Sequence, residues 1–232
     1  MLPNALQPNE TDHVPVLGEE VREFLAVRPG DVVVDATFGA GGHAELLAAE
    51  LQGRGKLVAI DRDPTVRPYF ERLRRRIGVQ ARFLRGDFST VLSQLAGNGC
   101  HADAILLDLG VSSMQVDRPG RGFSYAVDAP LDMRMDPSAE PSAAELVNEA
   151  SERELATIFR RYGEERYAKQ IARAIVKRRR SAPLERTGEL VERAEPRLDE
   201  GMPPVDGVGG EATIHPPGDD HAVGERLSEL RG

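Results

Sequence analysis

The first half of the chain alternates short apolar runs with stretches whose apolar residues recur every three or four positions. The apolar runs predict strands at residues 31–34, 56–60, 81–85 and 103–109. The helical periodicity predicts helices at residues 18–25, 43–52, 64–77 and 89–96. Continuous Val, Ile and Leu runs are typical of parallel strands that are buried on both faces. We therefore expect an α/β fold with a parallel sheet between helices.

The pattern changes after the fourth run. Residues 110–137 have no sustained periodicity, and two helices follow, separated by Gly163, after capping boxes at Ser142–Glu145 and Ser151–Glu154. Gly and Pro make up twelve of the last forty residues, so we expect these residues to be poorly ordered. The expected organisation is a sheet domain, a loop with a helical insertion, and a tail, at residues 1–112, 113–192 and 193–232.

Acids and glycines follow the first two strands. Asp35 ends the first apolar run, a loop with Gly41 and Gly42 leads into a helix, and Asp61 ends the second run. Glycine permits the sharp turn, and an acid after the second strand can bind both hydroxyls of a ribose. The spacing also satisfies the dinucleotide fingerprint, so an NAD-dependent oxidoreductase is an alternative. Asp35 favours S-adenosylmethionine, because a carboxylate would repel a pyrophosphate and can hold the cationic amino-acid end of that cofactor.

Charge is distributed unevenly along the chain. The net charge is −8 at pH 7, yet residues 153–186 hold eleven Lys or Arg against four Asp or Glu, and residues 193–232 hold four against nine. A basic segment can attract a phosphate backbone, although a solvated helix face is the ordinary interpretation. In the irregular segment, Arg118 and Arg121 stand near Phe123 and Tyr125, which is typical of phosphate and base binding. A mobile surface loop is the alternative interpretation.

Other sequence features restrict the class of protein. Cys100 is the only cysteine, which excludes an internal disulfide and a cysteine-based metal site, and we expect no metal. No apolar run approaches the roughly 20 residues that span a bilayer. The first residues also lack the basic and apolar regions of a signal peptide. We expect a cytoplasmic protein without a membrane partner.

Six motifs occur in a fixed order. They are His13-Val-Pro-Val-Leu17, Asp35-Ala-Thr-Phe-Gly-Ala-Gly-Gly-His43, Ala59-Ile-Asp-Arg-Asp-Pro64, Asp108-Leu-Gly-Val-Ser-Ser113 with Gln115, Arg121-Gly-Phe-Ser124, and Pro130-Leu-Asp-Met-Arg-Met-Asp136. Together they resemble the ribosomal RNA small-subunit methyltransferase H family, from about residue 13 to residue 192. Met114 stands where many members carry proline.

The resemblance implies a class I, Rossmann-like methyltransferase sheet with a helical insertion. It implies transfer of a methyl group from S-adenosylmethionine to the exocyclic N4 of a cytidine in the decoding centre of small-subunit ribosomal RNA. The implied cofactor contacts are Gly41, Gly42, His43, Asp61, Phe88, Asp108 and Gln115. Phe88 would pack on the adenine; without the resemblance, Phe88 is interpreted as a core residue and His43 as a residue at a helix start. The catalytic base is not assigned, and the candidates are Asp108, Asp132 and Asp136.

The last part of the chain departs from the family pattern. The family continues through a His-Pro-Ala motif and a Ser-Phe-His-Ser-Leu-Glu-Asp-Arg motif, whereas His215-Pro216 is followed here by Pro217 and the second motif is absent. We therefore expect a sheet that is incomplete on its C-terminal side, with the fourth strand as an open edge. A truncated or frameshifted, inactive form is the expectation for this chain. The alternative is a non-enzymatic remnant that binds RNA or protein, and a homodimer is a candidate assembly.

Overall fold

The computed structural model describes residues 15–139 and 141–194. The chain divides into two compact units, residues 1–108 and 109–232. Residues 195–232, which make up most of the expected tail, and His13 lie outside the described residues.

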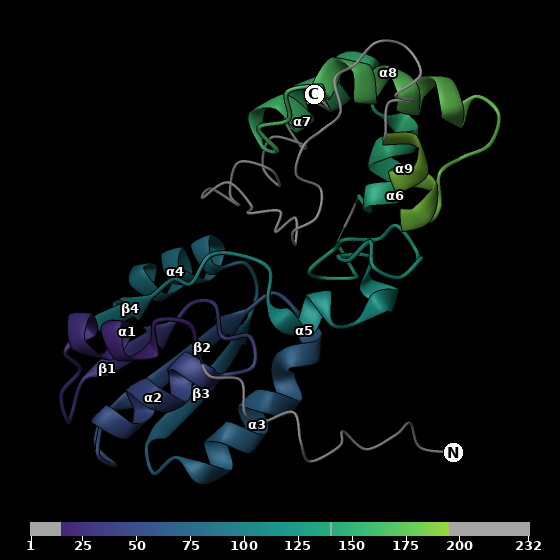
Figure 1. Ribbon diagram of the computed structural model, residues 1–232. Coiled ribbons are helices and arrows are strands. Elements are labelled where there is room, and N and C mark those ends of the chain that lie inside the picture. Colours follow the sequence, from purple (N-terminus) through teal and green to yellow (C-terminus); the bar gives the residue numbers. More distant parts are fainter. Residues whose placement is uncertain (1–14, 140, 195–232) are drawn as a thin grey trace. The chain divides into compact units, whose positions relative to one another are not determined.

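The first unit contains a parallel sheet of four strands, which confirms the expected α/β fold. The strands are β1 (Val32–Asp35), β2 (Lys56–Asp61), β3 (Gln80–Arg85) and β4 (Ala104–Leu106), in the order β3-β2-β1-β4 (Figure 1). The predicted fourth strand, residues 103–109, is too long. The Asp103 side chain accepts the N–H of Val32, and the backbone N–H of Asp108 donates to a threonine hydroxyl, so pairing with β1 is confined to the residues between them. Asp108 therefore lies two residues beyond β4.

Helices cover both faces of this sheet (Figure 1). They are α1 (Gly18–Leu25), α2 (Gly42–Glu50), the 3-10 turn η1 (Pro64–Val66) with α3 (Arg67–Arg76), and α4 (Phe88–Gly97). Helices α2 and α3 pack on one face, and α4 packs on the other, where Val34, Val58 and Ile60 form a core cluster with Val91. The helix start predicted at Pro64 is confirmed, because the Asp63 side chain accepts the N–H of Thr65 and caps η1.

An aromatic cluster anchors the loop between β1 and α2. Phe38 lies in this loop, and only 3% of it is exposed. Its ring packs edge-on against Phe70 of α3 and Phe83 of β3, with centroid distances of 5.8 and 6.2 Å. Such pairs add a favourable interaction to the burial of apolar area. The cluster fixes the backbone at the carboxyl end of β1, where ligands bind in open parallel sheets.

Strand β4 forms an edge of the described sheet, as expected from the sequence. Among the described residues, β4 pairs only with β1. Ile105 is 43% exposed and Leu107 is 44% exposed. Ile105 pairs with Val34 and therefore lies on the α4 face of the sheet, but α4 packs over β2 and leaves Ile105 accessible to solvent.

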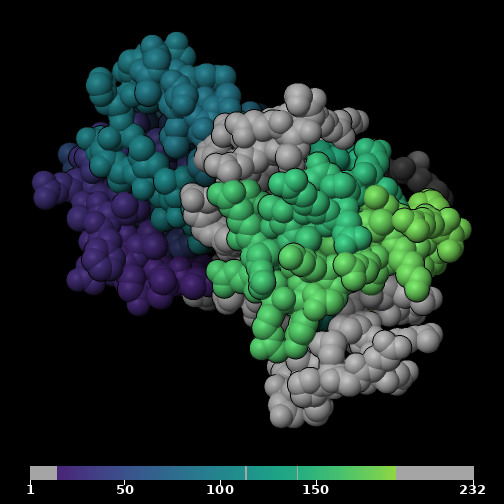
Figure 2. All heavy atoms as spheres, turned by 90° about the horizontal axis from the view of Figure 1, so that it is seen from above, coloured from purple at the N-terminus to yellow at the C-terminus, as the bar shows by residue number. Residues whose placement is uncertain are grey.

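The second unit, as far as it is described, consists of helices and one long irregular loop. Its helical elements are α5 (Ser113–Val116), the 3-10 turn η2 (Pro119–Arg121), α6 (Ala143–Glu149), α7 (Glu152–Arg161), α8 (Ala168–Arg179) and α9 (Thr187–Ala194), and the loop lies between η2 and α6. The core consists of Leu131, Val147, Leu155, Ala172, Ile175 and Leu184. Both predicted capping boxes, at the starts of α6 and α7, are present. The residues from α6 to α9, in green in Figure 2, form one closely packed group.

Candidate functional site

The loop between β1 and α2 requires glycine at position 41. Gly41 has φ +86°, and a Cβ atom there would lie 2.7 Å from the Cζ atom of Phe38. The Gly41 N–H donates to the Phe38 carbonyl oxygen at 2.8 Å, which closes the turn before Gly42 begins α2. A side chain at position 41 would strain the backbone and displace a buried ring. The predicted cofactor loop is thus a glycine turn built on an aromatic anchor.

Asp61 holds this loop from the neighbouring strand. Its Oδ2 atom accepts the N–H of Gly39 at 2.8 Å, and its Oδ1 atom accepts the N–H of Asp63 at 2.8 Å. Burial raises the pKa of the Asp61 carboxyl above its ordinary value. Each carboxylate oxygen has a second lone pair, so the same group can also accept hydrogen bonds from a ribose diol.

Asp35 is a buried carboxylate beneath the loop. Only 1% of the residue is exposed, and its Oδ1 atom accepts the N–H of Thr37 at 3.1 Å. Burial raises the pKa of Asp35 to about 7, and the charges of Asp61 and Asp108 act in the same direction, whereas His43 opposes the shift. Three acidic side chains, those of Asp35, Asp61 and Asp108, therefore lie around one glycine loop. A cationic ligand would hold their carboxyls ionised, so the arrangement favours such a ligand over a pyrophosphate.

Asp108 lies near two other residues of the site. Its backbone N–H donates to the Thr37 hydroxyl oxygen at 2.8 Å, and its Oδ2 atom lies 3.7 Å from Nδ1 of His43. The Nε2 atom of His43 lies 2.9 Å from the carbonyl oxygen of Val16. A carbonyl oxygen only accepts hydrogen bonds, so Nε2 of His43 is the donor to Val16, and the other ring nitrogen, Nδ1, faces the Asp108 carboxylate. The structure thus brings the predicted residues His43 and Asp108 together.

Phe88 and Gln115, two other predicted cofactor contacts, lie in different units. Phe88 is the first residue of α4 and packs, half-buried, against the Val34 and Ile60 cluster, which is the core role that its sequence context alone favours. Gln115 lies in α5 of the second unit, where its Oε1 atom accepts the N–H of Ser112 at 3.1 Å and the residue is buried.

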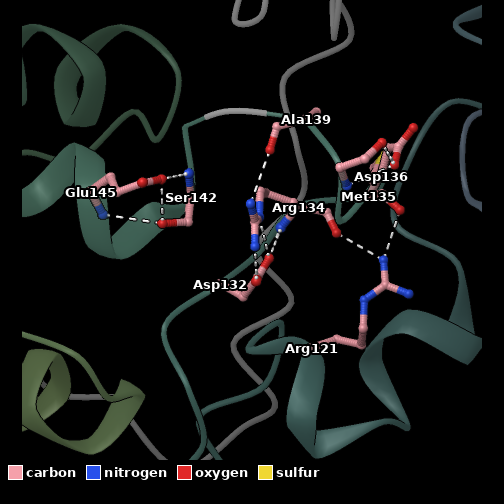
Figure 3. A network of polar contacts seen from close by, with 9 residues as sticks. Arg121, Asp132, Arg134, Met135, Asp136, Ala139, Ser142 and Glu145 are labelled. Carbon is pink, nitrogen blue, oxygen red and sulfur yellow. Dashed lines mark hydrogen bonds and ion pairs between the residues drawn. The ribbon is translucent and has the colours of Figure 1, made fainter.

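Two arginines tie together the irregular loop of the second unit (Figure 3). Arg121 donates from one nitrogen to the carbonyl oxygens of Arg134 and Met135, both at 2.8 Å. Gly122 follows with φ +72°, and a Cβ atom there would lie 2.4 Å from the Pro130 carbonyl oxygen. The loop is therefore closed on itself, and the Arg121 guanidinium contacts main-chain carbonyls.

The candidate catalytic acids Asp132 and Asp136 belong to this same loop. Arg134 contacts both carboxylate oxygens of Asp132, at 2.9 and 2.6 Å, and this hydrogen bonding lowers the pKa of Asp132 (Figure 3). Asp136 accepts the backbone N–H and the hydroxyl of Ser138 through one oxygen, at 2.9 and 2.6 Å. Both acids stabilise the loop conformation.

Helix α8 presents a row of cations to solvent. Its buried face consists of Ala168, Ala172 and Ile175. The exposed row follows the helical spacing and comprises Lys169, Arg173 and Lys177 of α8 and Arg180, the residue that caps its C-terminus. We call these four residues the α8 basic row. Arg179, by contrast, donates to the carbonyl oxygens of Val147 and Ala150 at 2.7 and 2.6 Å and caps the end of α6.

Within the described ranges, no group of three or more His, Cys, Asp or Glu side chains is arranged to hold a metal ion. In the same part of the chain, no helix is long and apolar enough to cross a membrane.

Comparison with known proteins settles the family. Residues 10–200 match the MraW methylase family. The chain belongs to the MraW methylase family. Ribosomal RNA small subunit methyltransferase H of Heliobacterium modesticaldum is 48% identical over 183 residues, which cover 78% of this chain and 58% of that protein. The protein of the same name from Burkholderia ambifaria is 46% identical over 191 residues, covering 79% and 59%.

Other comparisons concern length and shape. The chain spans somewhat more than half the length of these MraW-family relatives. Among solved structures, NSun6 from Pyrococcus horikoshii is similar over 41% of this chain and 24% of its own, with 26% identity and a TM-score of 0.35. None of these similarities supports the candidate homodimer.

Three parts of this candidate site were not predicted from the sequence. The Thr37 hydroxyl contacts Asp108, the Phe38 carbonyl oxygen contacts Gly41, and the Val16 carbonyl oxygen contacts His43. None of these three groups was a candidate. For Thr37 a signal exists, because a hydroxyl residue two positions after a strand-ending acid lies at the carboxyl edge of the sheet. The contact with Val16 could not be predicted, because every residue has a main-chain carbonyl whatever its side chain.

Proposed function

We propose that this chain binds S-adenosylmethionine at the carboxyl ends of β1, β2 and β4. The observation that carries the proposal is that three acidic residues, Asp35, Asp61 and Asp108, each contact the glycine loop by a hydrogen bond. The cofactor is a sulfonium cation with an amino-acid end, whereas NAD brings a pyrophosphate that these charges would repel. Asp61 fits the ribose, and Asp35 fits the positive end of the ligand.

The reaction proposed is methylation of the exocyclic N4 of a cytidine in the decoding centre of small-subunit ribosomal RNA. Support comes from the family and from the relatives named as ribosomal RNA small subunit methyltransferases. S-adenosylmethionine supplies an electrophilic methyl group to the amine nitrogen, and positioning of the two reactants provides most of the acceleration. The base must leave its stack to reach the cofactor. The proposed location of the reaction is the cytoplasm, where small ribosomal subunits are assembled.

Asp108 is the best supported of the three candidate proton acceptors. Its side chain is 61% exposed and lies beside His43 at the edge of the sheet. Asp132 and Asp136 are held by Arg134 and Ser138, and a carboxylate engaged in this way is a weak base. The proposal assigns the proton of the amine to Asp108 and a stabilising role to the two loop acids.

The α8 basic row is the proposed RNA contact. Its four cations lie on the solvent side of a helix whose opposite face is buried, and phosphate contacts of this kind need no base recognition. A non-enzymatic remnant would keep this contact and lose the methyl transfer. The expected difference between the two functions therefore lies in catalysis and not in RNA affinity.

One experiment separates the candidate functions. The chain is titrated by calorimetry with S-adenosylmethionine and, separately, with NAD, and is then incubated with labelled S-adenosylmethionine and small subunits that lack the modification. Methyl transfer to the RNA and the amount of chain that sediments with the subunits are both measured. Binding of S-adenosylmethionine with methyl transfer supports the proposal. Binding of RNA without transfer supports the remnant, and binding of NAD alone supports the oxidoreductase. The Heliobacterium relative serves as the positive control for transfer.

A further inference from the structure

Thr37 occupies a junction between two acids of the site. Its backbone N–H donates to Oδ1 of Asp35 at 3.1 Å, and its hydroxyl oxygen accepts the backbone N–H of Asp108 at 2.8 Å. Asp35 is the last residue of β1, and Asp108 lies in irregular backbone after β4. One short side chain thus connects the end of one strand to the segment that follows its neighbour.

The segment at Asp108 depends on this connection. Regular pairing between β1 and β4 ends at the pair Asp35 and Leu106, and the Ala36 N–H bond to the Leu106 carbonyl oxygen closes the ladder at 2.9 Å. Beyond that point, the main-chain N–H of Asp108 is bound by the Thr37 hydroxyl. The carboxylate of Asp108 is partly exposed, and its contact with His43, at 3.7 Å, is longer than a hydrogen bond. The position of the carboxylate therefore follows from where Thr37 holds the backbone.

We propose that Thr37 is a positioning residue that sets the place of the Asp108 carboxylate for cofactor binding. The proposal rests on the proposed function for the role of Asp108, and on geometry alone for the role of Thr37. Threonine suits the position because its hydroxyl accepts one hydrogen bond while its branched side chain has few rotamers. Serine keeps the acceptor, and valine keeps the shape without it.

The test compares four forms of the chain by two measurements. The forms are the unaltered chain, Thr37→Val, Thr37→Ser and the matched control Thr157→Val, which removes a threonine hydroxyl bond to the Arg153 carbonyl oxygen in α7. The first measurement is hydrogen exchange of the Asp108 amide by NMR, and the second is S-adenosylmethionine affinity by calorimetry. Thr37→Ala replaces the valine variant if the latter does not fold.

We expect Thr37→Val to speed exchange of the Asp108 amide at least tenfold and to weaken cofactor affinity roughly fivefold, the effect of one ordinary hydrogen bond. Thr37→Ser should restore both values to within about twofold of the unaltered chain, since it keeps the acceptor. Three results would overturn the proposal. They are unchanged exchange of the Asp108 amide in Thr37→Val, faster exchange with unchanged cofactor affinity, and a serine variant that behaves like the valine variant. An unaltered chain that does not bind the cofactor would overturn the proposed function, while the exchange data still decide whether Thr37 holds Asp108.

Discussion

The Oδ2 atom of Asp61 accepts a hydrogen bond from the backbone N–H of Gly39 at 2.8 Å. The acid at the end of β2 therefore shapes the glycine loop at the end of β1. Its other oxygen accepts the N–H of Asp63, at the start of the chain segment that leads to α3. A residue expected only to bind ribose is also a structural link between two strand ends.

This link predicts a double effect for Asp61→Ala. The N–H groups of Gly39 and Asp63 would lose their acceptor, which should lower the free energy of unfolding by about 2–4 kcal/mol. Binding of S-adenosylmethionine should be abolished, because the acceptor for the ribose hydroxyls is removed as well. Urea denaturation and calorimetry measure the two effects.

Asp103→Ala is the matched control for this variant. Asp103 also binds a backbone N–H, that of Val32 at 2.8 Å, but it does so at the amino ends of the strands. We expect a decrease in stability with cofactor affinity unchanged. An equal decrease of affinity in the two variants would show that Asp61 acts through stability alone.

The raised pKa of Asp35 predicts a pH-dependent gain of stability in Asp35→Asn. The pKa rises from 3.8 to about 7 on folding, so the folded chain holds this proton more tightly than the unfolded chain does. That contribution is fully present below pH 3.8 and is lost as the pH rises through about 7. Between pH 5 and pH 8, the stability of Asp35→Asn relative to the unaltered chain should rise by about 3 kcal/mol. Urea denaturation at both pH values tests this, and a constant difference would contradict it.

The same carboxyl predicts proton release when the cofactor binds. A cation beside Asp35 lowers the pKa of its carboxyl, so binding of S-adenosylmethionine near pH 7 should expel part of a proton. Calorimetry in phosphate and in Tris should then give different binding enthalpies. The difference should vanish in Asp35→Asn and should be smaller for S-adenosylhomocysteine, which lacks the sulfonium charge. Identical heats in the two buffers for the unaltered chain would refute the charge argument.

Asp132→Asn should loosen the loop of the second unit. The variant weakens the paired interaction with Arg134 and should lower stability by about 1–2 kcal/mol at pH 7. Because the pKa of Asp132 is lowered, this stabilisation is present above pH 3.8 and is lost as the pH falls through the lowered value. Faster trypsin cleavage after Arg134 measures the loosening. Abolished methyl transfer with unchanged cleavage would instead identify Asp132 as a proton acceptor.

Charge reversal in the α8 basic row should weaken RNA binding. The variant carries Lys169→Glu, Lys177→Glu and Arg180→Glu, and it leaves out Arg173, which pairs with Glu152. We expect affinity to fall by at least tenfold and the slope of log K against log salt to flatten by about 0.7–0.9 for each phosphate that is no longer neutralised. Arg179→Met is the control, because Arg179 caps α6 and its replacement should reduce stability and keep the salt slope.

Much of the fold could be predicted because each signal in the sequence is local. The predicted helix at residues 18–25 matches α1, and Asp63 with Pro64 marks the start of η1. The end of β4 could not be predicted, since the apolar run continues through Leu107 and Leu109 while pairing stops at Leu106. A hydrogen bond between residues 71 positions apart, from Asp108 to Thr37, takes the chain out of the sheet there.

The candidate site was predictable in part for the same reason. Acids after apolar runs identify strand ends, and parallel strands bring these ends to one edge, so Asp35, Asp61 and Asp108 could be expected to meet. The structural role of Arg121 could not be predicted. The sequence shows a cation near aromatic residues, but it does not show that Arg121 donates to the main-chain carbonyl oxygens of Arg134 and Met135.

The strand order of the first unit has a consequence for synthesis of the chain on the ribosome. Strands β1, β2 and β3 are synthesised first and lie side by side in the sheet. Strand β4 is synthesised last and pairs with the other edge of β1, although more than forty residues separate it from the end of β2. A nascent chain can thus assemble the glycine loop and its Asp61 link before residues 104–108 emerge. Asp108 arrives last and completes the group of three acids, so the proposed binding of the cofactor would begin only when the whole unit has been translated.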